Sequence, residues 1–246
     1  MKKNPEQFTS PESRERPTSR QIEIIMVRHG QQEIYEDPDS KLSHEGEKQA
    51  EEFALAIIDE YRNDNVIIKI KKSTEVRASQ TADIITATLA SKIENDGIEN
   101  IKLLKTRPSK HLKTTGALGE MMKAGVPSDK VVDEWLYNYE KYPEAKEPKD
   151  VVGQLNSVIS SAQKLSERLP SDEPKIVFIW VTHETAHSAL LNNITGKSTE
   201  ELGGGIGYLE PLKISIDGKN PPIAEFRNQE HQINIEENEG NEEKDT

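Results

Sequence analysis

The sequence predicts an α/β domain, a three-layer sandwich in which a mainly parallel sheet carries helices on both faces. Three observations support this fold class. Short segments rich in β-branched residues alternate along the chain with longer amphipathic segments, which is typical of such sheets. The two most apolar short segments, residues 22–27 and 176–181, have the composition of buried strands. Polar residues follow both of them, Arg28-His29-Gly30 and His183, at the strand ends where ligands bind in this class.

The first half of the chain contains the clearest elements. After the strand at 22–27, apolar residues at positions 50, 53, 54, 57, 58 and 61 form one stripe, which predicts a helix that begins at Ser43 or His44. Asn63-Asp64-Asn65 ends that helix, and Val66–Ile70 forms the next strand. A second helix is expected from about Glu75 to Ala90, capped by Ser73 or Thr74. A third strand is expected at Ile101–Leu104.

The second half is less regular before residue 150. Residues 107–147 indicate an insertion of short helices, of which Val131–Tyr139 is the best candidate. A helix with one apolar face is expected at 150–169, then the strand 176–181 and a helix from about Glu184 to Asn193. Glycines at 203–205 and 207 precede an expected hairpin, Tyr208–Ile216 with Ile223–Arg227.

Both ends of the chain are polar and are predicted to be disordered tails. Residues 1–20 have no apolar periodicity, and residues 229–246 hold seven acids and one lysine, half of the net charge of −12. The folded domain is therefore expected to span 21–228, with 107–147 as the insertion that sets substrate specificity.

Composition also excludes several classes of protein. The longest wholly apolar run, Ile176–Val181, is far shorter than the roughly 20 residues of a membrane-spanning helix, and no apolar signal region follows the N-terminal residues. We therefore expect a cytoplasmic protein without a membrane partner. The absence of cysteine excludes disulfides, thiolate metal ligands and a cysteine nucleophile. The acidic balance argues against a nucleic-acid partner.

Arg28-His29-Gly30 suggests phosphoryl chemistry. A neutral imidazole can attack phosphorus and form a phosphohistidine, and arginine matches the phosphate oxygens in pairs. Nearby cations disfavour protonation of His29 and keep it nucleophilic. Gly30 would let the backbone approach an anion closely. By itself the triplet is a weak signal, and a salt-bridged arginine beside a packed histidine would be the favoured explanation of it.

The surrounding phrases make the signal specific. The triplet closes the first strand, LSHEGEKQA opens the first helix, STEVRASQTA opens the second, and VTH closes a late strand. In this order, from about Ile22 to Leu191, the sequence resembles the histidine phosphatase superfamily, the phosphoglycerate mutase-like proteins. The resemblance implies their fold, with His29 as the nucleophile and with Arg28, Arg77 and His183 holding the phosphate. It implies no cofactor. Arg77 would also sit in the first turn of its helix, a favourable position for binding an anion.

The sequence departs from the family at the proton donor. The mutase-like branch places a glutamate just after the third strand, whereas this chain has no acid from Ile101 through Gly119. The phytase-like branch places an acid directly after the second histidine, which here makes Glu184 the first candidate. Glu120 is the second candidate, and a reaction without a strong acid is the third possibility.

A local basic cluster occupies the same acid-free stretch: Lys102, Lys105, Arg107, Lys110, His111 and Lys113. It could steer an anionic substrate or a phosphorylated partner, or it could be a solvated loop. The two interpretations stay open at this stage.

Two other classes of protein compete with the phosphatase. His183-Glu184-Thr185-Ala186-His187 matches the HExxH zinc-peptidase motif, for which Glu200 or Glu201 would supply a third ligand. That motif needs both histidines inside one helix, whereas a strand is expected to end at His183. A non-catalytic relative that keeps the phosphate pocket is the other alternative. The sequence favours a metal-independent phosphatase acting on a phosphomonoester or a phosphorylated protein. Mutase-type phosphotransfer is less favoured, because the residues after Gly30 lack the threonine and asparagine common in mutases.

Overall fold

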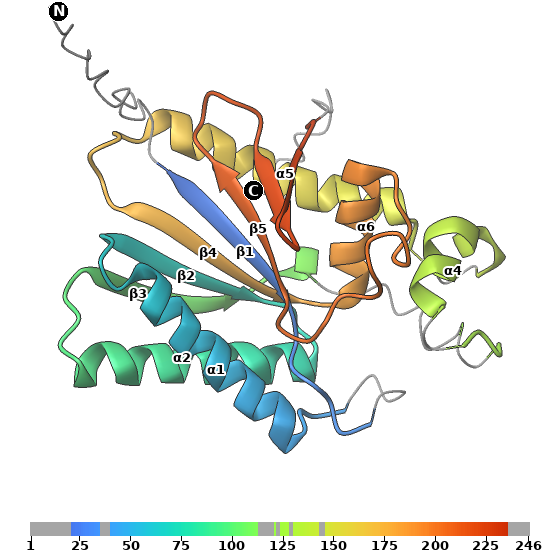
Figure 1. The fold of residues 1–246 in the computed structure, drawn as a ribbon, viewed down its shortest axis with the longest axis horizontal. Helices are drawn as coiled ribbons and strands as arrows, with labels where there is room; N and C mark the ends of the chain where they lie inside the picture. Colours follow the sequence, from blue (N-terminus) through green and yellow to red (C-terminus); the bar gives the residue numbers. More distant parts are fainter. Residues whose placement is uncertain are drawn as a thin grey trace, which may run out of the picture.

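The computed structural model describes residues 21–34, 40–112, 121, 124–127, 130–142 and 146–235 (Figure 1). The strands are β1 (Ile22–Arg28), β2 (Val66–Lys72), β3 (Ile101–Pro108), β4 (Lys175–Thr182), β5 (Pro211–Ile216), β6 (Ile223–Phe226) and β7 (Gln229–Gln232). The helices are α1 (His44–Tyr61), α2 (Val76–Asn95), α4 (Val131–Asn138), α5 (Pro148–Arg168) and α6 (Glu184–Thr195). Two 3₁₀ turns, η1 (Lys110–Leu112) and η2 (Tyr139–Lys141), complete the described elements.

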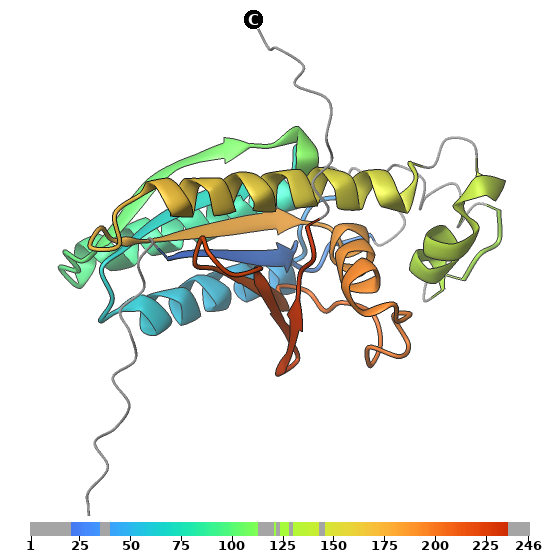
Figure 2. The ribbon, with the colours of Figure 1, turned by 90° about the horizontal axis from the view of Figure 1, so that it is seen from above.

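The strands form one seven-stranded sheet in the order β3-β2-β4-β1-β5-β6-β7. Its first four strands run parallel, and β5, β6 and β7 are antiparallel. Helices α1 and α2 pack on one face of the sheet, and α5 and α6 lie on the other (Figures 1 and 2). The predicted three-layer α/β fold is therefore confirmed.

The central strand β1 explains the apolar run that opens the domain. Ile25 and Val27 face the core formed with α1 and α2, whereas Ile24 and Met26 face the core formed with α5 and α6. A strand covered on both faces buries every side chain, so its sequence shows no polar alternation. β4 pairs with β1 in register, so that Arg28 lies opposite Thr182.

Most predicted elements occur near the expected positions, and α1 begins with Ser43 as its N-cap, whose side chain accepts a hydrogen bond from the Gly46 amide. The predicted cap of α2 is wrong, because Glu75 holds the N-cap position and makes no side-chain cap bond. β3 is also longer than expected and continues to Pro108. Among the described residues, no helix is long and apolar enough to cross a membrane.

The C-terminal boundary of the domain requires a correction. Residues 229–235 were assigned to the acidic tail, but Gln229–Gln232 form β7 and Ile233 is buried. Arg227 and Asn228 both have positive φ, as a two-residue hairpin turn requires, and they return the chain alongside β6. β7 is a polar edge strand, so its composition resembles a tail. The expected tails at 1–20 and 236–246 lie outside the described residues, as do parts of the insertion 107–147.

Candidate active site

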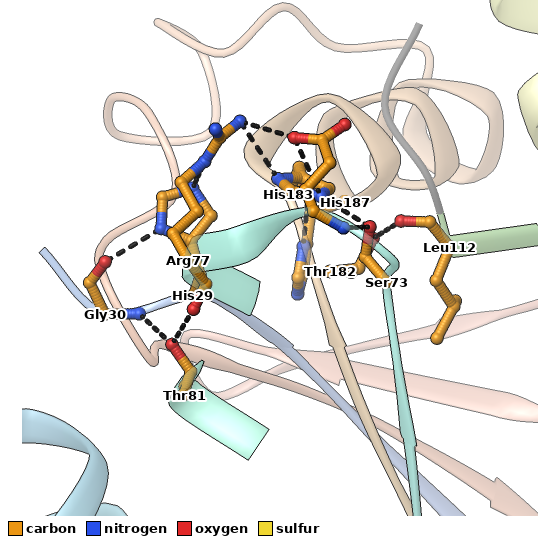
Figure 3. A network of polar contacts seen from close by, with 10 residues as sticks. His29, Gly30, Ser73, Arg77, Thr81, Leu112, Thr182, His183 and His187 are labelled. Atoms are coloured by element: carbon orange, nitrogen blue, oxygen red, sulfur yellow. Dashed lines mark hydrogen bonds and ion pairs between the residues drawn. The ribbon is translucent and has the colours of Figure 1, made fainter. Parts of the chain in front are cut away.

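The site lies at the carboxyl ends of β1 and β4, where the chain places two histidines side by side. The amide of His29 donates a hydrogen bond to the Thr182 carbonyl (3.0 Å), which joins the two strand ends. The rings of His29 and His183 meet edge to face with their centroids 5.3 Å apart. Figure 3 shows both rings beside the side chain of Arg77, which comes from the first turn of α2.

The contacts of His29 define its tautomer. Its Nδ1 lies 2.8 Å from the Gly30 carbonyl oxygen, and because a carbonyl can only accept, Nδ1 carries the proton. Nε2 therefore has the free lone pair, which accepts a hydrogen bond from Nε of Arg77 (2.9 Å). Burial, and then the charge of Arg77, lower the pKa of His29 to about 3. The imidazole is consequently neutral at physiological pH.

Arg77 connects the two histidines. Its Nη2 lies 3.4 Å from Nδ1 of His183 and forms an ion pair with Oε2 of Glu75 (2.7 Å). The same carboxylate oxygen is 3.5 Å from Nε2 of His183. Glu75 thus stands inside the group of residues that the sequence assigned to phosphate binding.

His183 is held from the other side by Ser73. The residue is the N-cap of α6, with an extended backbone (φ −130°, ψ 160°), and its Nε2 lies 2.9 Å from Ser73 Oγ. Burial lowers the pKa of His183 well below its usual range, and the neighbouring His29 and Arg77 act in the same direction. Both histidines are therefore neutral groups in a site whose positive charge comes from arginine.

Arg28 and Glu184 form a second group next to the histidines. Nη1 of Arg28 donates to the Ile206 carbonyl (2.7 Å) and pairs with Oε2 of Glu184 (2.9 Å). The guanidinium lies over the Tyr208 ring, 4.3 Å from its centroid, and that ring is 6.0 Å from the His29 ring. The structure thus brings Arg28 and Glu184 together.

The carboxyl group of Glu184 is mostly buried, and this burial opposes its ionisation. Burial raises the pKa of Glu184 even though the charge of Arg28 opposes that shift. Gly205 lies against this carboxylate, since a Cβ at Gly205 would overlap Oε1 of Glu184. The other donor candidate, Glu120, lies outside the described residues.

Gly30 has a different function from the one expected. Its amide donates to Thr81 Oγ1 (3.1 Å), and an added Cβ would come within 2.5 Å of the Gly46 carbonyl oxygen. A Cβ on Gly46 would likewise overlap the Gln31 carbonyl. Gly30 and Gly46 are therefore required because the loop after β1 packs directly against the first turn of α1. The structure does not support the expectation that Gly30 approaches an anion.

The geometry does not favour the zinc interpretation. Nδ1 of His187 faces the His183 carbonyl oxygen (3.2 Å), while the ring nitrogens of His183 face Ser73 and Arg77. In the described part of the chain, no group of three histidine, aspartate or glutamate residues could hold a metal ion. His187 is a buried residue of α6, one turn after the helix begins.

The sequence does not identify three residues of the site: Ser73, Glu75 and Tyr208. Ser73 was expected to cap a helix, and Glu75 lies in the phrase that carries Arg77. The position of Ser73 or Glu75 in the sequence does not indicate that the side chain turns toward the strand ends rather than toward solvent. Tyr208 follows the glycine-rich stretch, and only the pairing of β5 with β1 brings it next to His29.

Comparison with known families agrees with this arrangement. Residues 24–103 match the sequence profile of the histidine phosphatase superfamily (branch 1). This range contains Arg28-His29-Gly30 and the Arg77 phrase, and it confirms the predicted resemblance to that superfamily. A comparison with curated proteins gives no match.

Solved structures show the same fold at low sequence identity. A mycobacterial glucosyl-3-phosphoglycerate phosphatase superposes with a TM-score of 0.55 and 19% identity, covering 80% of this chain and 91% of its own. Phosphoserine phosphatase from Entamoeba histolytica gives 0.53 and 16%, covering 87% and 98%. Phosphoglycerate mutase from Bacillus anthracis gives 0.53 and 16%, covering 87% and 95%. The chain therefore has the phosphoglycerate mutase-like fold.

Proposed function

We propose that the protein is a metal-independent phosphatase that works through a phosphohistidine on His29. The observation that carries the proposal is the state of His29, a buried neutral imidazole whose Nδ1 is fixed by Gly30 and whose Nε2 lone pair faces Arg77. Such a nitrogen is a ready nucleophile for phosphorus. The similarity to structures named as phosphatases supports the same reaction class.

The reaction would take place in two steps. The lone pair of Nε2 attacks phosphorus, the bond from phosphorus to the leaving oxygen breaks, and that oxygen takes a proton from an acid. Water then attacks the phosphohistidine, so that the P–N bond breaks and inorganic phosphate leaves. Arg77 and His183 would hold the phosphate oxygens and stabilise the charge that spreads over them.

Arg77 would have to turn from the lone pair of His29 to the phosphate before attack, because its Nε now donates to Nε2. Arg28 would join Arg77 at the phosphate by exchanging its contact with Glu184 for a phosphate oxygen. That exchange would free the Glu184 carboxyl group, whose raised pKa suits a proton donor.

The substrate class that fits these groups is a phosphomonoester, either a small molecule or a phosphorylated protein. A cytoplasmic location and the absence of nucleic-acid and membrane partners stay predictions from composition.

Hydrolysis of an aryl phosphate tests the reaction without depending on the acid, because the leaving group is good. We expect turnover that resists EDTA and that His29→Ala abolishes. His44→Ala is the matched control, since the His44 side chain is 97% exposed at the start of α1. Binding of phosphate without turnover would instead indicate a non-catalytic relative, and activity lost to EDTA would contradict the metal-independent mechanism.

A further inference from the structure

A group of positive side chains gathers at the carboxyl ends of β2 and β3, away from the catalytic histidines. Its members are Lys71 on β2, Lys110 and His111 in η1, and Lys146 just before α5; we call them the His111 group. Nζ of Lys71 lies over the rings of Phe178 and Trp180, which belong to the core on the α5 side of the sheet. α5 also packs against η1, so the group lies on this side.

The charges of this group are not balanced by neighbouring acids. The charged neighbours of the His111 ring are Lys110, Lys71 and Lys146, all of them cations. Within the described ranges, none of these three lysines takes part in a salt bridge. Asp150 acts on Lys146 and opposes the lowering of its pKa by burial. Like charges are therefore gathered at one place in a chain whose net charge is −12.

The group is also partly desolvated. Nδ1 of His111 is buried and has no hydrogen-bond partner. Burial and neighbouring lysines lower the pKa of His111, and the same two causes lower the pKa of Lys71, where the neighbour is Lys69. Crowding uncompensated cations and an unpartnered ring nitrogen costs free energy, which a bound anion would offset. Lys110 is exposed, but Lys71, His111 and Lys146 are half-buried, which a freely solvated loop, the alternative left open by the sequence, would not require.

The His111 group is separate from the catalytic histidines, but hydrogen bonds attach its segment to the same strand ends. The Ser109 amide donates to the Lys72 carbonyl (2.8 Å), and Thr182 Oγ1 donates to the Leu112 carbonyl (2.9 Å). Ser73 and His183 directly follow Lys72 and Thr182 in the sequence. The side chains of Ser73 and His183 contact each other, and His183 also lies near Glu75 at the start of α2. The charged groups that act on His111 are Lys110, Lys71 and Lys146, and none of them belongs to the residues around His29 and His183.

We propose that the His111 group is a second anion site, which binds a phosphate group through the ammonium groups of Lys71, Lys110 and Lys146. The phosphate could be free inorganic phosphate or the ester of a larger ligand, because both present the same oxygens. The site is independent of the phosphatase reaction, and it gives a function to part of the basic cluster found in the sequence.

Imidazole NMR signals of the full-length protein test the proposal directly, since each of the six histidines reports its own surroundings. Inorganic phosphate is titrated at constant ionic strength, so that general screening does not change. A parallel titration with O-phosphoserine uses the His29→Ala protein, to prevent hydrolysis. The comparison variants are Lys71→Ala/Lys110→Ala and, as a matched loss of two charges elsewhere, Lys48→Ala/Lys164→Ala, at exposed positions of α1 and α5.

We expect the His111 signal to move and saturate, with binding weakened at least about tenfold in Lys71→Ala/Lys110→Ala and unchanged in the control, a difference of about 1.4 kcal/mol. The tighter of the two probes identifies the source of the phosphate. Movement of the His29 and His183 signals in the phosphate titration, and of the His183 signal in the His29→Ala protein, reports the catalytic site separately, so either site can fail without the other. A His111 signal that does not saturate with either probe, or saturates equally in the double variant, would overturn the proposal.

Discussion

At the scale of single residues, the carboxylate of Glu75 is the least expected feature of the site. It pairs with Arg77 and approaches His183, where a phosphate oxygen would bind in the proposed reaction. A carboxylate within about 6 Å of a phosphate dianion would repel it by on the order of 2–3 kcal/mol per unit charge at an effective dielectric constant of 20. In the proposed reaction, the Glu75 carboxylate is therefore an internal anion that the substrate phosphate would displace.

Removing that anion should tighten phosphate binding. We expect Glu75→Ala to lower the inhibition constant of inorganic phosphate by about tenfold, with Glu75→Gln in between. Competition against aryl phosphate hydrolysis measures the constant in each variant. If phosphate bound more weakly to Glu75→Ala, the carboxylate would instead be needed to position Arg77.

Glu184 leads to a prediction that depends on the leaving group. Burial raises the pKa of Glu184, which extends to higher pH the range in which the carboxyl group keeps the proton needed for donation. Glu184→Gln should therefore slow an alkyl phosphate by roughly 10²–10⁴-fold while changing an aryl phosphate little. The alkaline fall in kcat/KM for the alkyl ester should disappear in the variant. Steady-state kinetics with both esters measure these effects, and Glu200→Gln is the control because Glu200 is exposed. Equal losses of activity for both esters would rule out the donor role of Glu184.

At the scale of elements, the contact between the loop after β1 and the first turn of α1 positions His29. The backbones of Gly30 and Gly46 touch there, and the Ser43 amide donates to the Gln31 carbonyl (2.9 Å). The amide of Gln31 in turn donates to the side chain of Gln49 (3.0 Å). The phrase that opens α1 thus forms a clamp on Gly30 and Gln31, which directly follow His29.

An added methyl group should break this clamp. Gly46→Ala would place Cβ against the Gln31 backbone, so we expect a loss of about 1–3 kcal/mol of unfolding free energy and reduced activity. Gly153→Ala in α5 is the control, because no atom lies within 4 Å of its Cβ, and it should stabilise by about 0.5–1 kcal/mol. Urea unfolding with a parallel activity assay measures both. A Gly46→Ala protein as stable and active as wild type would show that the loop can relax.

The local pattern of apolar residues predicted most helices and strands, but it did not predict where each one ends or which segments pair with each other. The apolar stripes of α1 and α5 and the buried strands β1 and β4 follow directly from periodicity, because packing selects the side chains that face the core. β7 was missed since a polar edge strand has no buried face to mark it. Glu75 and Tyr208 were missed for a related reason: long-range pairing, which composition does not encode, brings Glu75 to His183 and Tyr208 to His29.

At the scale of the whole molecule, burial of neutral histidines makes stability depend on pH. His29, His183 and His187 all have pKa values below the ordinary value of 6.5, chiefly because of burial. Unfolding therefore takes up protons below about pH 6.5, and stability is present above that value and is lost as pH falls.

We expect the unfolding free energy to fall between about pH 6.5 and pH 5 by up to roughly 1.4 kcal/mol per pH unit for each of these histidines. Urea unfolding at a series of pH values measures the slope. His29→Asn removes one titrating group and should reduce the slope by about one proton. An unchanged slope in that variant would mean that His29 titrates normally in the folded protein.

The most direct test of the central claim is to capture the intermediate. The protein is mixed rapidly with an aryl phosphate, stopped with base and digested, and the peptides are examined by mass spectrometry. The account predicts one phosphoryl group on His29 that survives base, is lost in acid, and is absent from His29→Ala. Steady turnover with no phosphoryl group on His29 at any time, or with the group on another residue, would contradict it.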